Sequence, residues 1–101
     1  NKMSAGTTTQ TKTETKLATV KLWNVVLLND DYTPMDFVIA VLMQLFDKSE
    51  DEAYEITMAV HNNGKGIAGT FTKEIAYQKV SDVAMAAQAY GHPLLAVCEE
   101  Q

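Results

Sequence analysis

The sequence predicts a small α+β domain, in which a three-stranded, mainly antiparallel sheet packs against three helices in the order βααβαβ. Three short apolar segments have the composition or alternation of strands, and three longer segments have helical spacing with start and stop signals. The helices are too few and too unevenly placed for a doubly wound parallel sheet. With 101 residues, 47% of them hydrophobic, the chain has enough apolar material for one core.

The beginning of the chain differs in composition from the rest. Residues 1–19 contain seven threonines together with Lys, Gln, Ser and Gly, and only scattered apolar side chains. Such a segment cannot bury enough surface to offset the entropy of ordering it. We therefore expect a flexible N-terminal extension at residues 1–19 and a core domain at residues 20–101.

The first strand and the first helix follow this extension directly. The strand is expected at about residues 21–29, which are dense in Val, Leu and Trp. Thr33 and Pro34 then start a helix that runs to about Phe46. The Thr33 hydroxyl is the expected N-cap, and the proline occupies the first helical position.

The middle of the chain contains a second helix and a second strand. The sequence from Ser49 to Glu52 is a capping box, which opens the helix, and the Asn-Asn-Gly run at 62–64 ends it. A short strand is expected at residues 65–72, with Ile67 and Phe71 on one face.

The last two elements are a third helix and a third strand. Thr72 is the expected N-cap of a helix that reaches about Tyr90, and the Gly-His-Pro run at 91–93 breaks it. The final strand, at residues 94–99, alternates. One of its faces carries Leu94, Ala96 and Cys98.

The first helix carries more apolar side chains than one buried face requires. Four of them have the spacing of a core-facing stripe: Phe37, Val41, Leu42 and Leu45. Four others lie partly on other faces: Met35, Val38, Ile39 and Met43. Either another helix covers this second group, or the first turn of the helix borders a hydrophobic pocket.

Two adjacent carboxylates, Asp30 and Asp31, stand where the first strand gives way to this helix. Acids beside a helix N-terminus are expected to stay ionised at neutral pH, so the pair could bind a cation. The alternative is that both aspartates only cap and solvate a turn. A cation site beside an apolar pocket would suit a primary amine with a bulky apolar side chain.

Composition and charge exclude several classes of protein. The net charge of −5 and the lack of a Lys/Arg cluster argue against nucleic-acid binding. Cys98, the only cysteine, cannot form an internal disulfide, which suits a reducing cytoplasm. We expect neither a membrane span nor a signal peptide, because the sequence shows no 18-residue apolar run and no charged-then-apolar leader.

A set of motifs from about Lys21 to Glu99 resembles the ClpS family, the adaptors of the bacterial N-end rule degradation pathway. The motifs are specific as a set, in their order and separation. They are Asn29-Asp30-Asp31-Tyr32-Thr33-Pro34-Met35, Ala59-Val60-His61, Gly64-Lys65, Gly69, Phe71-Thr72, Glu74, Lys79 and His92-Pro93-Leu94-Leu95.

The resemblance implies a site for the first residue of a substrate protein. Asn29, Asp30 and His61 match the ligands of its free α-amino group, and Asp31 and Thr33 match residues that line the same mouth. The first side chain, usually Phe, Leu, Trp or Tyr, would enter an apolar pocket with Met35 as its gate. Its walls match Met35, Val38, Val60 and Leu94.

The chain departs from the family pattern at one position of this pocket. Thr57 stands where members of the family usually carry Met or another larger aliphatic residue, so one wall becomes smaller and gains a hydroxyl. The resemblance also implies that Glu74 and Lys79 dock on the N-terminal domain of a ClpA-type AAA+ unfoldase, and that the extension enters the unfoldase channel during handover.

The sequence therefore predicts a cytoplasmic, monomeric, non-enzymatic adaptor without a cofactor, which delivers N-degron proteins to a Clp protease. Two other functions remain open at this point. One is a protein-interaction module that binds a partner through its apolar first helix. The other is a small metal-dependent hydrolase that uses Asp30, Asp31 and His61. A nucleophilic pair of Cys98 with His61 or His92 lacks an activating environment in the sequence.

Overall fold

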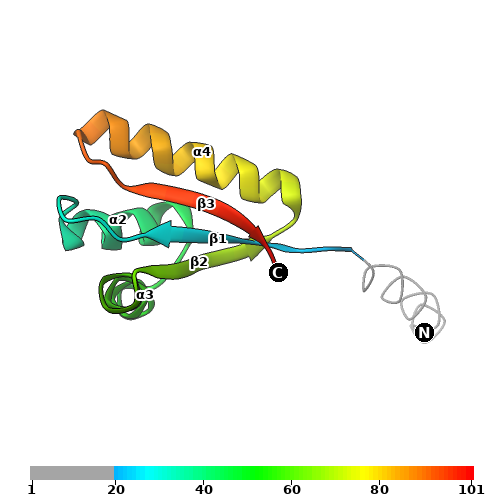
Figure 1. The fold of residues 1–101 in the computed structure, drawn as a ribbon, viewed down its shortest axis with the longest axis horizontal. Coiled ribbons are helices and arrows are strands. Elements are labelled where there is room, and N and C mark those ends of the chain that lie inside the picture. Colours follow the sequence, from blue (N-terminus) through cyan, green and yellow to red (C-terminus); the bar gives the residue numbers. More distant parts are fainter. Residues whose placement is uncertain (1–19) are drawn as a thin grey trace, which may run out of the picture.

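The computed structural model describes residues 20–101, so the expected extension at 1–19 lies outside the described part of the chain. The described elements follow the predicted order βααβαβ (Figure 1). They are β1 (Trp23–Leu28), α2 (Met35–Leu45), α3 (Glu50–Asn63), β2 (Lys65–Phe71), α4 (Lys73–Tyr90) and β3 (Leu95–Glu100).

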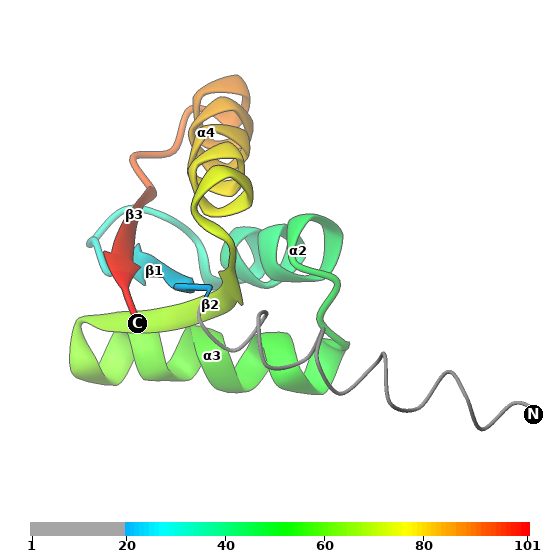
Figure 2. The ribbon, with the colours of Figure 1, turned by 90° about the vertical axis from the view of Figure 1, so that its right-hand side faces the viewer.

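The three strands form one sheet in the order β2-β1-β3, and both pairs are antiparallel. The predicted fold class is confirmed. Figure 2 shows α2 and α4 on one side of the sheet, while α3 runs alongside β2. The other face of the sheet carries no helix among residues 20–101.

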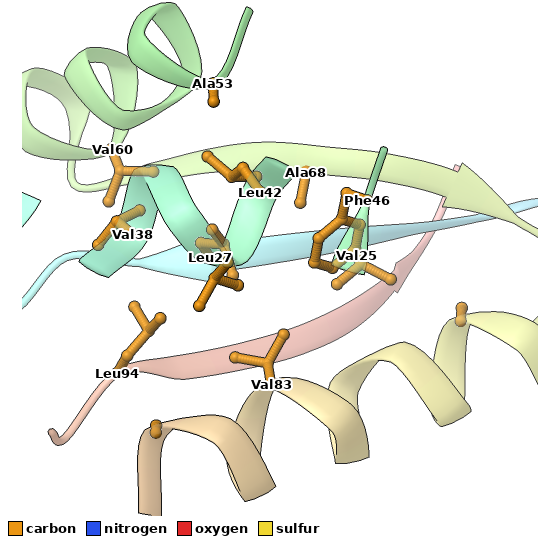
Figure 3. Packing of buried hydrophobic residues seen from close by; sticks show 13 residues of the cluster. Val25, Leu27, Val38, Leu42, Phe46, Ala53, Val60, Ala68, Val83 and Leu94 are labelled. Atoms are coloured by element: carbon orange, nitrogen blue, oxygen red, sulfur yellow. The ribbon is translucent and has the colours of Figure 1, made fainter. Parts of the chain in front are cut away.

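The core lies between the sheet and the helices (Figure 3). Val25 and Leu27 on the central strand β1 point toward it and are fully buried. Leu42 from α2 and Val83 from α4 meet them there, and both are also fully buried. This packing holds the central strand β1 in place, and with it the end of β1 where the loop to α2 begins.

The turn between α3 and β2 is tied to the end of β1. Gly64 adopts a left-handed conformation with φ of 89°, which favours glycine and ends α3. The Asn29 backbone N–H donates to the Gly64 carbonyl at 2.9 Å. At Gly66 an added Cβ would lie 2.9 Å from the Val60 side chain, so glycine lets β2 pass close to α3. These contacts hold the last turn of α3 next to the β1–α2 loop.

The capping predictions are met at one helix and fail in part at two others. At Ser49 the full capping box is present, with both reciprocal hydrogen bonds to Glu52. Thr72 occupies the N-cap position of α4, but its side chain makes no capping hydrogen bond. The prediction that Thr33 caps α2 is wrong, because Pro34 is the N-cap residue and the Thr33 hydroxyl donates to Asp30 instead.

The prediction that Ile67 and Phe71 share a face is also wrong. Val25 pairs with Gly69 and the next residue, Val26, pairs with Ile67, so Ala68 is an extra residue in β2. This bulge inverts the alternation of side chains along the strand. As a result Ala68 is buried in the core, Phe71 packs against the core, and Ile67 is 52% exposed on the other face.

Candidate functional site

A cavity of about 240 Å³ lies where the loop after β1 meets the start of α2 and the end of α3. All ten residues that the sequence assigned to a substrate site line it, although they come from separate parts of the chain. Its lining consists of Leu28, Asn29, Asp30, Asp31, Thr33, Met35, Val38, Thr57, Val60, His61 and Leu94.

Asp30 organises the polar side of this cavity. Its Oδ1 accepts hydrogen bonds from the backbone N–H groups of Tyr32, at 2.8 Å, and Thr33, at 2.7 Å. Its Oδ2 accepts the hydroxyl of Thr33 at 2.7 Å. The carboxylate therefore holds the loop in one conformation, as expected for an aspartate in a turn. Thr33 cannot cap α2 because its hydroxyl is already bound here.

The same hydrogen bonds keep Asp30 ionised. Partial burial acts to raise the pKa of Asp30, but the hydrogen bonds from Thr33 and Tyr32, together with the nearby His92, outweigh burial and lower the pKa below its ordinary value. An ionised carboxylate has about four lone-pair directions, and three of them are used by these donors. One acceptor direction on Oδ2 is left for a further donor.

The residues beside Asp30 make the mouth of the cavity polar. Asn29, Asp31 and His61 all line the cavity and all have exposed side chains. His61 lies in the last turn of α3, and a neutral imidazole has one ring nitrogen that can accept a hydrogen bond. The mouth therefore combines fixed negative charge with an amide and an imidazole, a combination that suits a charged hydrogen-bond donor such as an ammonium group.

The inner wall of the cavity is apolar. Val38, Val60 and Leu94 line it and are 6%, 4% and 3% exposed. Met35 in the first turn of α2 is 41% exposed, so its flexible side chain stands at the rim. The additional apolar side chains in the first turn of α2 therefore border a cavity. This was one of the two alternatives that the sequence left open.

Thr57 belongs to the same wall and is 3% exposed. Its hydroxyl donates to the Ala53 carbonyl within α3 at 2.7 Å. Because this hydrogen bond satisfies the hydroxyl, Thr57 adds no unpaired polar group to the wall. The part of the cavity wall that Thr57 forms is therefore effectively apolar.

His92 also lies in this region, although the sequence motif that contains it did not assign it to the substrate site. Its ring packs against Phe37 at 4.6 Å between centroids, and it is one of the groups that lower the pKa of Asp30. The backbone N–H of His92 donates to the Ala87 carbonyl, which fixes the loop after α4. No local pattern links positions 30 and 92. The fold alone brings them together.

The two residues assigned to partner docking lie on α4, outside the cavity. Glu74 is exposed in the first turn of the helix. Lys79 is half-buried, and its Nζ donates to the Leu45 carbonyl at 2.5 Å. The same ammonium lies 5.7 Å from the Phe46 ring and 5.8 Å from the Phe71 ring. Lys79 thus joins α4 to the C-terminal end of α2.

Features that would suit other functions are weak in the described residues. Burial raises the pKa of the Cys98 thiol, which keeps it protonated at neutral pH. Within residues 20–101 no group of three or more His, Cys, Asp or Glu side chains could hold a metal ion. Among the helices of these residues, none has the length and hydropathy of a membrane-spanning segment.

The fold and the cavity define a small α+β domain with a binding pocket at one end of its sheet, polar at the mouth and apolar inside. Residues 18–97 match the family model described as ATP-dependent Clp protease adaptor protein ClpS. This chain therefore belongs to the ClpS family of Clp protease adaptors.

Individual relatives agree with the family model. The chain is 50% identical over 93 residues to the ATP-dependent Clp protease adapter protein ClpS of Deinococcus radiodurans, a match that covers 92% of this chain and 82% of that protein. It is 46% identical over 96 residues to the ClpS of Helicobacter hepaticus, covering 95% and 97%. Both matches extend over nearly the whole core domain.

A solved structure shows the same fold. Agrobacterium tumefaciens ClpS2 bound to L-phenylalaninamide matches with a TM-score of 0.78 and 36% sequence identity, over 80% of this chain and 98% of that chain. The ligand named for that protein has a free amino group and a benzyl side chain.

Proposed function

We propose that this protein binds the free α-amino group and the bulky apolar side chain of a substrate's first residue, and that it delivers the substrate to a Clp AAA+ unfoldase. The observation that carries the proposal is the cavity itself. At its mouth lies the ionised Asp30, which has one acceptor direction free, and its inner wall consists of buried apolar side chains. An α-ammonium group bonded to an apolar side chain has the complementary chemistry.

In this arrangement the ammonium donates to Oδ2 of Asp30, while Asn29 and His61 take its other hydrogen bonds. The side chain of Phe, Leu, Trp or Tyr enters between α2 and α3, and Met35 closes over it. L-phenylalaninamide, the ligand of the related ClpS2, has both of these groups. Catalysis is not needed for this function, and the proposal includes neither an enzymatic activity nor a cofactor.

The proposal is tested by fluorescence anisotropy with two peptides that begin with Phe and differ only in an acetyl group on the amine. Binding of the free peptide alone supports amine recognition. A protein-interaction module that binds partners through α2 would treat both peptides alike. For the hydrolase alternative, metal analysis of the purified protein is the corresponding test, and bound stoichiometric metal would favour it.

Docking on the N-terminal domain of a ClpA-type unfoldase is proposed for the surface that carries Glu74 and Lys79. The remaining parts of the proposal are a monomeric state, a cytoplasmic location and a role for residues 1–19 as an extension that enters the unfoldase channel. Glu74 gives the sharper test of docking, because its side chain is exposed, whereas Lys79 also binds the end of α2.

Glu74→Lys is expected to weaken binding to the unfoldase N-domain by at least tenfold while peptide affinity stays unchanged, since a reversed charge in a docking surface adds like-charge repulsion. Glu55→Lys on α3 is the matched control, with the same change of charge at another exposed position. Isothermal titration calorimetry measures both. Equal docking by the two variants would show that Glu74 is not part of the docking surface.

Thr57→Met is expected to shift the pocket's preference toward Leu and away from Ile, Phe and Trp, because the longer side chain fills space in the wall. Pocket shape discriminates by about 1–3 kcal/mol per methylene-sized difference, so the ratio of affinities should change several-fold. The measurement compares peptides that begin with Leu, Ile, Phe and Trp on both proteins.

Thr57→Val is the matched control for this substitution. It keeps the size of the side chain and removes the hydroxyl that binds the Ala53 carbonyl, so the wall stays equally small. We expect it to rank the four peptides as the natural protein does. If Thr57→Met leaves the ranking unchanged too, then the size of this residue does not set the preference.

A further inference from the structure

The face of the sheet opposite the helices carries exposed apolar side chains, most of which do not line the cavity. Ile67, Leu95 and Val97 on this face are 52%, 61% and 36% exposed. Side chains of β1 alternate with those that enter the core, so Val26 points toward this face as well. We refer to the following residues as the open sheet face: Asn24, Val26, Leu28, Lys65, Ile67, Leu95, Val97 and Glu99.

The strand register arranges these side chains in rows across the sheet. Val26 pairs with Ile67 on one side and with Val97 on the other. Leu28 pairs in the same way with Lys65 and Leu95. The bulge at Ala68 creates the first row, since it turns Ile67 away from the core. The first row is apolar on all three strands, although Val26 itself is only 1% exposed, and the second row is apolar on β1 and β3. We call these two rows the strip.

An ion pair lies across this strip. Lys65 is opposite Leu28 and Glu99 is opposite Asn24, on the two sides of the central strand, and yet Lys65 Nζ is 3.4 Å from Glu99 Oε2. The two side chains therefore meet over the middle of the face. Both are about half exposed, and such pairs contribute little to stability. An incoming chain can displace this pair at little cost.

The strip begins at the pocket. Leu28 itself lines the cavity, and Leu95 immediately follows Leu94, which lines it too. Lys65 follows Gly64, whose carbonyl is bound to the Asn29 backbone. The near end of the strip is thus adjacent to the cavity on β1 and β3, and on β2 it follows the turn that is bound to Asn29.

We propose that the open sheet face binds the extended segment that follows the first residue of the substrate, and that it favours apolar side chains at alternate positions of that segment. The inference rests on the proposed function of the pocket. From Leu28 to Asn24 the face extends about 13 Å, the length of four to five extended residues. A chain that lies on it presents every second side chain to the apolar rows.

The test uses two peptides that begin with free Phe and have the same length and charge. One carries Leu at positions 4 and 6, and the other carries Ser there. The natural protein should bind the Leu peptide roughly 3- to 10-fold more tightly, as expected for partial burial of two side chains. In Ile67→Thr/Val97→Thr this preference should disappear, with the Ser peptide bound as before. Met85→Gln, an exposed apolar position on α4, is the control and should keep the preference.

The outcomes separate this proposal from the proposed function. Equal affinity of the natural protein for the two peptides, or a preference that survives in the double variant, overturns the role of the open sheet face. Failure of both peptides to bind the natural protein contradicts the pocket instead. If the double variant loses binding to the unfoldase or loses self-association in sedimentation velocity, and keeps the peptide preference, then the face belongs to that other partner and the proposal is wrong.

Discussion

Asp30→Asn is expected to weaken binding of a peptide that begins with free Phe by roughly 10- to 150-fold, because a hydrogen bond to a charged group is worth about 1.5–3 kcal/mol. Asparagine keeps an oxygen that can accept the backbone N–H groups of Tyr32 and Thr33, so the turn is retained. The variant loses the negative charge that faces the ammonium, and because an amide NH2 replaces Oδ2, it also loses the acceptor of the Thr33 hydroxyl. Fluorescence anisotropy measures the affinity, and thermal unfolding checks the fold.

Asp36→Asn provides the matched control. Asp36 lies in the first turn of α2, is exposed, and does not line the cavity. The Asp36→Asn variant loses one negative charge, as Asp30→Asn does, at a nearby position in the chain. We expect this variant to bind the peptide with the affinity of the natural protein. If both variants bind normally, Asp30 only holds the turn together. Asp30→Ala is less informative, because it removes the turn's acceptor together with the charge.

Acetylation of the peptide's amine is expected to lower its affinity at least tenfold, which corresponds to about 1.4 kcal/mol. A neutral amide has one N–H instead of three charged donors, so Asp30 would be left partly desolvated without an ionic partner. The added acetyl group also requires space at a mouth lined by Asn29 and His61. Both effects act in the same direction.

A third peptide separates the contribution of the amine from that of the side chain. It has a free amine and begins with Ser, and it should bind weakly because it leaves the apolar wall unfilled. Equal affinity for the free and acetylated Phe peptides would refute amine recognition. Equal affinity for the Phe and Ser peptides would refute the apolar pocket.

The fold was predictable because local signals agree with the tertiary structure. The capping box at Ser49 opens a helix, and the Asn-Asn-Gly run ends it at a left-handed Gly64. The alternation after Leu94 was also correct, with Ala96 and Cys98 packed toward the core and Leu95 exposed. At these positions a pattern of a few residues determines the local backbone.

The differences arise where distant contacts decide the structure. The bulge at Ala68 depends on pairing with β1, so the composition of β2 alone could not predict which face Ile67 occupies. Thr33 has the sequence signature of an N-cap, but the carboxylate of Asp30 competes for its hydroxyl. Lys79 looks like a surface residue in the sequence, whereas it contacts a carbonyl 34 residues away.

The candidate site could be predicted residue by residue only through the family resemblance. Periodicity suggested an apolar first turn in α2, and the paired aspartates suggested a cation site. Neither observation could link these residues to Thr57 in α3 or to Leu94 after α4, because no local pattern joins such distant positions. The side-chain network around Asp30, including His92, required the structure.

The most direct test of the central claim is a crystal structure of the protein with a short peptide that begins with free Phe. We expect the amino nitrogen within about 3 Å of Asp30 Oδ2, and the ring between Val38, Thr57 and Val60. A peptide whose amine points to solvent, or whose ring lies outside the cavity, would contradict the proposed recognition of the N-terminal residue.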